Sequence, residues 1–406
     1  MLAKSILLSE KIEQLKNLTK IKVNTSVSLV NDALLKIVEK EKNAQIEIVF
    51  KESDYKKYSA EFFACLKGVN ANFSTLIVNK TCKSFYSSKT LSSLSKKVCI
   101  VVGDDDFIKA TNIICSQKNI SCYAFLTSPY FTELLKEEYT YIEMGKLITK
   151  KAEPIKHLFI CENLIKKSGV FNTLNAYAYN LIQAITLIDY KFSSLLAGKI
   201  ADDGYYKLLK QALNYALSFS SYDNPSSALT LSSFIVNIVD ASCDIIKNST
   251  ASNFIKIIRL LNDDCPLPKL YFIGFEKLVK LYHLFFTNDF SDVLLYPDYV
   301  NDVEKLCLIV ANDQEEFYKN LKIPSAKRLE LINKLLKKVS QTFLNETTAF
   351  LKALPKIEKA FYVELCKEVK NTQVEVDDVK DALRLSTYLT ASQNVLVIMR
   401  DFGLLN

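Results

Sequence analysis

The chain contains 406 residues, of which 49% are hydrophobic and 24% are charged. This composition excludes a disordered or fibrous protein and allows two packed domains. The net charge of +7 comes from 52 Lys and Arg against 45 Asp and Glu, and acidic residues stand among the lysines along most of the chain. Because a nucleic-acid interface needs a local excess of positive charge, we expect no nucleic-acid partner.

The apolar residues are distributed as in a protein without a membrane segment. No run approaches roughly 18 uninterrupted apolar residues, and the N-terminus has neither the apolar length nor the cleavage-like site of a signal peptide. The ten cysteines lie mostly inside apolar runs without CxxC or CxxxC spacing, which is typical of reduced core thiols. We therefore expect a cytoplasmic protein with no membrane partner.

The first part of the chain, up to about residue 165, alternates short β-branched runs with stretches long enough for helices. Nearly continuous apolar strands separated by helices are typical of a parallel sheet covered on both faces. We predict a Rossmann-like α/β domain over residues 1–165. Its predicted strands are Gln45–Phe50, Ser74–Val78, Val98–Val102, Ser121–Leu126 and His157–Cys161.

After about Glu162 such runs stop and helical periodicity takes over. We predict an all-helical domain over residues 166–406, with the boundary at Lys166–Gly169 and no large sheet after residue 200. The expected helix breaks are Asp202-Asp203-Gly204, Asp223-Asn224-Pro225 and Cys265-Pro266-Leu267-Pro268. One long helix is predicted at Ala326–Leu351, with an apolar face made of Leu329, Leu331, Ile332, Leu335, Leu336, Val339, Phe343 and Leu344.

Short stretches in both parts carry a family resemblance: Val101–Asp106, Phe125–Ser128, Asn175–Tyr190, and Pro225–Asp240 with Tyr388–Leu405. In this order they resemble, respectively, a strand with its Gly-rich loop, a cofactor turn, a helix with the first metal ligand, and a second ligand segment with the closing helix. The chain resembles the superfamily of dehydroquinate synthases and iron-containing alcohol dehydrogenases, and within it most closely the glycerol-1-phosphate dehydrogenases. The resemblance implies a nucleotide-binding α/β domain, a helical domain and a catalytic metal.

Other residues stand where the resemblance places metal ligands. The family binds its metal through a carboxylate and two histidines. Tyr179, with Asn180 beside it, replaces the aspartate, and the last histidine would fall near Leu270–Phe272. Leu229 and Thr230 occupy the glutamate and histidine positions of the second segment. We therefore expect no metal and no catalytic residue at these positions.

The chain has two histidines, and both are expected to pack rather than to bind a metal. His157 opens a predicted buried strand, and His283 lies on a helix some distance after the place of the family's last ligand. Two histidines also leave little room for a Ser-His-Asp or Cys-His arrangement.

The cofactor loop departs from the family as well. Glycine lets a backbone approach a phosphate closely, but the chain has only 8 glycines, about 2% against a usual ~7%. Gly103 is followed by three aspartates, Asp104 to Asp106, which repel a pyrophosphate or, alternatively, cap the helix that follows. The cofactor-binding candidates are Gly103 and the hydroxyls of Thr127 and Ser128, which alternatively only shape a turn.

Two functions are compatible with these features. The first is a degenerate, non-catalytic member of the superfamily that binds or assembles with an unknown small molecule or protein, possesses no cofactor, and can form a homo-oligomer. The second is an NAD(P)-dependent oxidoreductase that acts on a small, optionally phosphorylated, polyol or ketone without the usual metal. The aspartates after Gly103 and the missing ligand histidines favour the first hypothesis.

Overall fold

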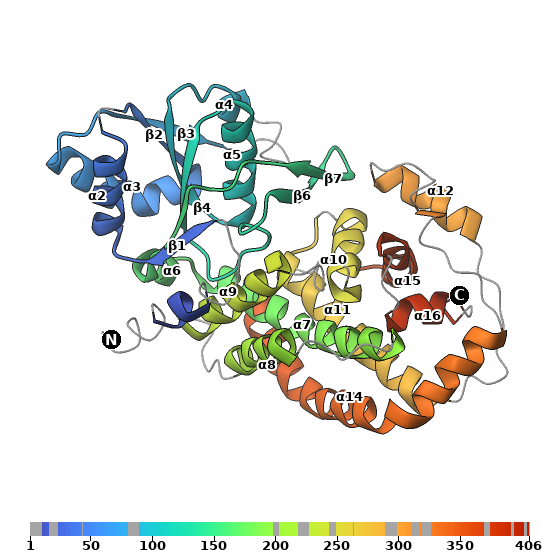
Figure 1. The fold of residues 1–406 in the computed structure, drawn as a ribbon. Helices are drawn as coiled ribbons and strands as arrows, with labels where there is room; N and C mark the ends of the chain where they lie inside the picture. Colours follow the sequence, from blue (N-terminus) through green and yellow to red (C-terminus); the bar gives the residue numbers. More distant parts are fainter. Residues whose placement is uncertain are drawn as a thin grey trace. The chain divides into compact units, whose positions relative to one another are not determined.

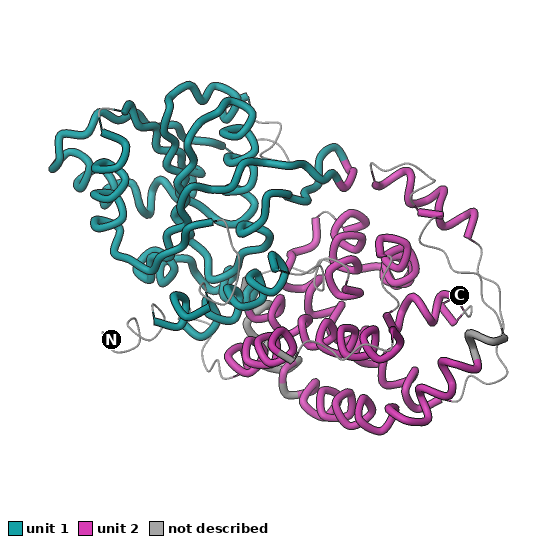
Figure 2. Tube along the Cα trace, in the orientation of Figure 1, with its two compact units in different colours: residues 1–144, 148–176, 218–242 teal, residues 145–147, 177–217, 243–406 magenta. Residues whose placement is uncertain are grey.

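The computed structural model describes residues 10–15, 23–42, 44–79, 89–197, 203–217, 227–242, 249–262, 264–288, 299–310, 317–318, 326–368, 374–390, 394–401 and 404–405, except the side chains of 326–329, 356 and 358–368. Two compact units are present (Figure 2). Unit 1 comprises residues 1–144, 148–176 and 218–242, and unit 2 comprises residues 145–147, 177–217 and 243–406. Among the described residues, no helix is long and apolar enough to cross a membrane.

Unit 1 is built on a six-stranded parallel sheet with strand order β1-β8-β5-β4-β2-β3. This confirms the α/β prediction, and the predicted strands match within a residue at either end. The strands are β1 (Asn24–Val27), β2 (Ile46–Lys51), β3 (Phe73–Val78), β4 (Val98–Gly103), β5 (Ser121–Leu126) and β8 (His157–Ile160).

Helices cover both faces of this sheet (Figure 1). The helices α2 (Val30–Lys40) and α3 (Glu52–Gly68) pack against one face, whose inward side chains include Ile48, Phe50 and Ile100. The helix α5 (Asp105–Gln117) packs against β4 and β5 on the other face. Every residue of β4 is buried, as expected for a strand with helices above and below it.

The remaining elements of unit 1 are short helices, a hairpin and a long helix. They are α4 (Lys89–Ser92), α6 (Glu162–Lys166), α9 (Ser227–Ser242), and the two-stranded sheet of β6 (Glu138–Glu143) and β7 (Lys146–Lys151). The sequence analysis missed β1 and this hairpin. The hairpin turns at Met144 and Gly145, which both have positive φ.

Apart from residues 145–147, which belong to the β6–β7 hairpin, unit 2 is helical in its described residues, which confirms the predicted fold class. Its helices are α7 (Val170–Leu196, with its first turns in unit 1), α8 (Asp203–Leu217), α10 (Thr250–Leu261), α11 (Leu267–Thr287), α12 (Tyr299–Ile309), α14 (Ala326–Glu368), α15 (Val376–Ser386), the 3-10 turn η1 (Thr387–Leu389) and α16 (Val395–Asp401).

The two units divide the chain differently from a single boundary at residues 165 and 166. A break does occur there, because α6 ends at Lys166 and Gly169 has a φ of +87°. Unit 1 nevertheless continues into the first turns of α7 and includes α9, whose Asn237 Nδ2 donates to Phe131 O at 2.6 Å. A long-range return of this kind leaves no local mark in the sequence.

Several finer predictions about unit 2 can also be compared with the structure. The α11 helix begins directly after Pro266, as expected, and α8 begins at Asp203, whereas Asp202 and Asp223–Pro225 lie outside the described residues. Ile332, Leu336 and Phe343 of α14 are buried as predicted. The assignment of Leu331 to the apolar face is wrong, because its side chain is 60% exposed.

A buried carboxylate joins the helices of unit 2. Asp189 of α7 accepts hydrogen bonds from Thr250 N at 3.0 Å and from the Tyr282 hydroxyl at 2.6 Å. Burial raises the pKa of Asp189 to about 6, although these hydrogen bonds oppose the shift. Asp189 therefore connects α7, α10 and α11.

Candidate functional site

The carboxyl ends of β2, β4 and β5 bring polar side chains together in unit 1. Ligands of open parallel sheets bind at this edge because loops and helix N-termini converge there. Lys51 ends β2, Gly103 ends β4, and Thr127 follows β5. Asp54 stands in the first turn of α3, directly after β2. Of these residues, Lys51 and Asp54 were missed by the sequence analysis, and their signal was their position just after a predicted strand.

Asp104 caps α5 and forms an ion pair with the neighbouring strand end. Its Oδ1 accepts a hydrogen bond from Phe107 N at 3.2 Å, which confirms the capping alternative. Its Oδ2 lies 2.8 Å from Lys51 Nζ, and both side chains are about a quarter exposed. Burial lowers the pKa of the Lys51 ammonium, whereas the nearby carboxylate of Asp104 raises it. The net result is a raised pKa.

Asp54 is the carboxyl group at this end of the sheet whose pKa is shifted towards neutral pH. Burial raises the pKa of Asp54 to about 6, and the charge of Asp104 adds to this shift. Lys51 and a hydrogen bond from the Thr127 side chain oppose it. Near neutral pH this carboxyl group can therefore exchange a proton, and it can donate or accept a hydrogen bond.

Gly103 serves packing in this structure. A Cβ built on Gly103 would lie 2.5 Å from Cδ1 of Phe107, whose ring is fully buried. The space that a missing side chain leaves for a phosphate in a glycine loop is thus filled by an aromatic ring.

The two candidate hydroxyls are also engaged within the protein. The Thr127 side chain hydrogen-bonds to Asp54, while its backbone N–H donates to Gly103 O at 2.9 Å. Ser128 Oγ accepts from Tyr130 N at 3.1 Å. Both residues are almost fully buried. These bonds shape the turn after β5, while a cofactor-binding role for Gly103, Thr127 and Ser128 stays a prediction.

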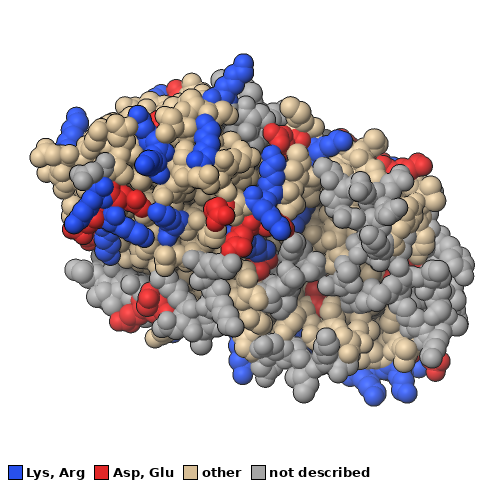
Figure 3. All heavy atoms as spheres, turned by 45° about the horizontal axis from the view of Figure 1, so that its top comes forward, with Lys and Arg blue, Asp and Glu red and all other residues tan. Residues whose placement is uncertain are grey.

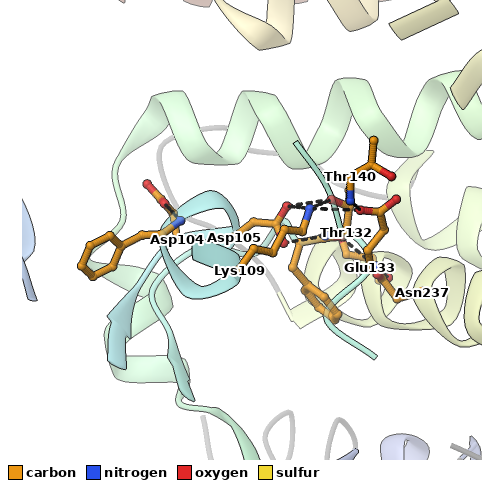
Figure 4. A network of polar contacts seen from close by, with 10 residues as sticks. Asp104, Asp105, Lys109, Thr132, Glu133, Thr140 and Asn237 are labelled. Carbon is orange, nitrogen blue, oxygen red and sulfur yellow. Dashed lines mark hydrogen bonds and ion pairs between the residues drawn. The ribbon is translucent and has the colours of Figure 1, made fainter. Parts of the chain in front are cut away.

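A buried ionic network occupies the other side of the α5 N-terminus (Figure 4). Asp105 accepts hydrogen bonds from Thr132 N at 2.9 Å and from Thr132 Oγ1 at 2.7 Å, and its Oδ2 lies 2.9 Å from Lys109 Nζ. Lys109 Nζ also lies 3.7 Å from Glu133 Oε2, and this carboxylate accepts from Thr140 N. Asp104 points away from the network.

Burial and neighbouring charges shift the pKa values of Asp105 and Lys109 in this network. Burial raises the pKa of Asp105 to about 6, and the adjacent Lys109 charge opposes the shift. Burial lowers the pKa of Lys109, but Asp105 and Glu133 more than compensate, so its ammonium stays protonated. The segment after Ser128 is thereby tied to the first turn of α5.

These contacts decide whether a pyrophosphate fits the α5 N-terminus in the manner of the family's glycine loop. It does not fit, because Asp104 and Asp105 place carboxylates on both sides of that terminus and Phe107 covers Gly103. A dinucleotide would have to make its polar contacts elsewhere on this edge, and Lys51 and Asp54 at the end of β2 are the groups that present themselves.

The positions that the resemblance assigns to metal ligands are buried and carry no imidazole, thiolate or carboxylate. The ring of Tyr179 packs edge-on against the ring of Tyr271, with centroids 5.6 Å apart. Tyr271 lies in the Leu270–Phe272 segment, where the last ligand histidine would fall. Leu229 and Thr230 are buried within α9. This set of donors does not fit a divalent first-row metal, and no group of three or more His, Cys, Asp or Glu among the described residues could bind one.

The two histidines pack as expected. The ring of His157 stacks on Phe159 with centroids 4.2 Å apart, and its Nε2 lies 2.8 Å from Ser26 Oγ. His283 Nδ1 lies 3.2 Å from Thr347 Oγ1, between α11 and α14.

No protein-family model and no curated protein matches the sequence, but solved structures match the fold. An iron-containing alcohol dehydrogenase superposes with a TM-score of 0.52 at 10% identity, covering 95% of this chain and 98% of that one. The iron-containing alcohol dehydrogenase of Thermotoga maritima gives a TM-score of 0.51 at 10% identity, with coverage of 95% and 98%. The sulfoacetaldehyde reductase from Bifidobacterium kashiwanohense, solved with NAD+, gives 0.54 at 10% identity, with coverage of 94% and 97%.

The last of these structures corrects one expectation. We expected no cofactor because aspartates replace the glycines after Gly103, and this expectation is wrong, since the reductase that shares the fold was solved as a complex with NAD+. The error has a physical origin, because the sequence analysis considered the α5 terminus and the turn after β5 but not the end of β2, where Lys51 and Asp54 lie. From end to end, the chain has the fold of the iron-containing alcohol dehydrogenases, as the resemblance predicted.

Proposed function

We propose that unit 1 binds a nicotinamide dinucleotide and that the protein does not carry out metal-assisted hydride transfer. The observation that carries the second part is the Tyr179–Tyr271 ring pair, which fills two positions that the resemblance assigns to metal ligands. Buried rings in contact provide no imidazole, thiolate or carboxylate for a metal.

The first part is supported by the fold and by the groups at the end of β2. In dinucleotide-binding sheets, residues at neighbouring strand ends contact the ribose. Asp54, with its pKa near 6, can hydrogen-bond a ribose hydroxyl, and Lys51 provides a positive charge for an anionic group. Because Asp104 competes for Lys51 and repels phosphates, we expect a dissociation constant well above micromolar, closer to 1 mM, which corresponds to about −4 kcal/mol.

The protein's own residues would then bind and orient the dinucleotide. The nicotinamide of the dinucleotide would supply hydride chemistry only if a substrate and a proton donor were bound beside it. Without a metal site, these side chains best support a binding or assembly role. The predicted cytoplasmic location, the homo-oligomer and the small-molecule or protein partner remain proposals.

An activity assay with a metal control tests this function. Purified protein is loaded with Zn²⁺ or Fe²⁺, desalted, and assayed by elemental analysis and for NAD(P)H oxidation with small aldehydes and ketones. We expect far less than one metal per chain and no turnover above the protein-free rate. Metal near one per chain with turnover would contradict the proposal, and metal-free turnover of an aldehyde or ketone would support the oxidoreductase hypothesis instead.

A further inference from the structure

A lysine of unit 2 lies beside two aromatic rings that come from different helices. Lys191 of α7 places its ammonium 5.7 Å from the ring centroid of Tyr206 on α8 and 5.5 Å from that of Phe343 on α14. Glu346 follows Phe343 by three residues, so both are neighbours on the surface of α14, and its Oε1 lies 3.8 Å from the ammonium. We call Tyr206, Phe343 and Glu346 the aromatic cage.

The aromatic cage is held in place by contacts within the protein. The Phe343 ring is fully buried and stacks on the Phe286 ring with centroids 4.9 Å apart. The Tyr206 hydroxyl donates to Glu346 Oε1 at 3.4 Å, which joins the second ring to the carboxylate. Because these groups are already ordered, a cation that binds between them causes little further loss of conformational entropy.

The Lys191 ammonium is a poor chemical match for the aromatic cage. It carries three hydrogen-bond donors, but within the part of the chain that the structure describes it makes no hydrogen bond, and 3.8 Å to Glu346 is too long for one. An aromatic ring attracts the charge of a cation but accepts only weak hydrogen bonds. A quaternary ammonium group has no N–H donor to satisfy, so it suits these surroundings better than a lysine does.

Another described lysine near a ring shows the contrast. The Lys156 ammonium lies 6.0 Å from the ring centroid of Tyr123, but it also donates a hydrogen bond to Glu41 Oε1 at 3.0 Å. That lysine is satisfied by a carboxylate and contacts one ring. Lys191 instead lies beside two rings with its carboxylate at a longer distance.

We propose that the aromatic cage is a binding site for a small ligand with a trimethylammonium group, and that Lys191 competes with this ligand for the site. The Lys191 side chain is 31% exposed and that of Glu346 is 33% exposed. The lysine ammonium can therefore turn into solvent, where its three donors are hydrated, while the ligand enters from the same side. The site lies within unit 2 and does not depend on dinucleotide binding.

A titration of the intact protein with choline tests the proposal, with binding followed by the broadening of the choline methyl signal in NMR. For the wild type we expect saturable binding in the millimolar range, because Lys191 has to be displaced. Lys191→Ala should bind choline roughly five-fold more tightly, because the substitution removes both a competitor and a like charge. The matched control is Lys280→Ala, which removes a lysine that pairs with Glu276 on α11 of the same unit and should bind choline as the wild type does.

The choice of cation tests the hydrogen-bond argument. Tetramethylammonium should displace choline, whereas ammonium at the same concentration should displace it far less, because its N–H donors find no acceptor in the aromatic cage. Phosphocholine should bind more weakly than choline because Glu346 repels its phosphate, which distinguishes a free cation from a phosphocholine head group. Tighter binding of phosphocholine, or equal displacement by ammonium, would contradict the assigned ligand class.

Variants of the aromatic cage locate the bound choline. In the Lys191→Ala background, Tyr206→Leu should weaken choline binding roughly ten-fold and Glu346→Gln roughly three-fold. No saturable choline binding by Lys191→Ala, or unchanged affinity after Tyr206→Leu, would overturn the proposal, and Lys191 would then only join three helices. If Lys191→Ala does not fold, Lys191→Gln removes the charge with a smaller change in volume, and the wild-type titration alone decides whether choline binds.

Discussion

The Lys51 ammonium lies 2.8 Å from Asp104 Oδ2, so the end of β2 is tied to the cap of α5. This ion pair places a protein carboxylate where a ligand anion would otherwise meet Lys51. Acidic and basic residues are likewise intermixed on the face drawn in Figure 3. The charge at the carboxyl ends of β2 and β4 is therefore set by the protein's own side chains, Lys51 and Asp104. It can be changed by substituting one residue at a time.

Replacing Asp104 by asparagine should tighten dinucleotide binding. Asparagine caps a helix about as well as aspartate, so α5 should stay intact while one negative charge beside Lys51 disappears. For a pair about a quarter exposed we expect a gain of about 1 kcal/mol, roughly five-fold in the dissociation constant of NAD+ or NADP+, measured by calorimetry.

The control for this variant is Asp377→Asn, which makes the same charge change in the first turn of α15, in unit 2. It should leave the affinity unchanged. Equal affinities of wild type and Asp104→Asn would show that the dinucleotide does not meet Lys51.

Gly103→Ala should destabilise unit 1 through a clash with Phe107. The new Cβ would lie 2.5 Å from a buried aromatic carbon, and overpacking of this kind costs about 1–3 kcal/mol. The double variant Gly103→Ala/Phe107→Leu should recover part of the loss, as seen in thermal unfolding. Gly68→Ala is the control, because nothing lies within 4 Å of a Cβ at Gly68, and it should not lower the unfolding temperature.

Removing one partner of the buried ion pair should cost more than removing both. Asp105→Ala leaves the Lys109 ammonium, 3% exposed, with Glu133 at 3.7 Å as its remaining carboxylate. We expect a loss of about 3–5 kcal/mol in urea unfolding. The double variant Asp105→Ala/Lys109→Met should lose clearly less. Additive losses would mean that the pair contributes no coupling energy.

The stability of unit 2 should depend on pH through Asp189. Its folded pKa of about 6 lies above the ordinary aspartate value of 3.8, so the folded state binds more protons than the unfolded state between these two pH values. Above pH 6 the ionised Asp189 therefore destabilises the folded state by on the order of 3 kcal/mol at most. This destabilisation disappears as the pH falls towards 4.

Asp189→Asn removes this titration. We expect its unfolding midpoint, followed at several pH values between 4 and 7, to change less with pH than that of the wild type. Asp54 and Asp105 titrate in the same range, so the comparison is the difference between the two proteins. Parallel pH profiles would show that Asp189 does not titrate there.

The sequence was informative where one local pattern determines the structure. Strand β4 is apolar throughout because it is covered on both faces, and such a run is readable. Strand β1 was missed because it is short and polar and is an outermost strand of the sheet. The β6–β7 hairpin was missed although Tyr139 and Tyr141 alternate with polar residues, because the analysis searched for continuous apolar runs.

The candidate site was less predictable, since it depends on contacts between distant residues. The capping role of an aspartate after Gly103 follows from local chemistry and was anticipated as an alternative. The pairing of Asp105 with Thr132, and that of Lys51 with Asp104, requires the strand order and cannot be read from spacing. The same is true of the Tyr179–Tyr271 ring contact, which joins helices far apart in the chain.

The most direct test of the proposed function is a calorimetric titration of the intact protein with NAD+ and NADP+ at physiological salt, with and without Zn²⁺ or Fe²⁺. The account predicts weak, saturable binding of at least one dinucleotide, with the same dissociation constant whether or not metal is added. The absence of saturable binding by both dinucleotides, or binding that tightens on adding metal, would contradict it.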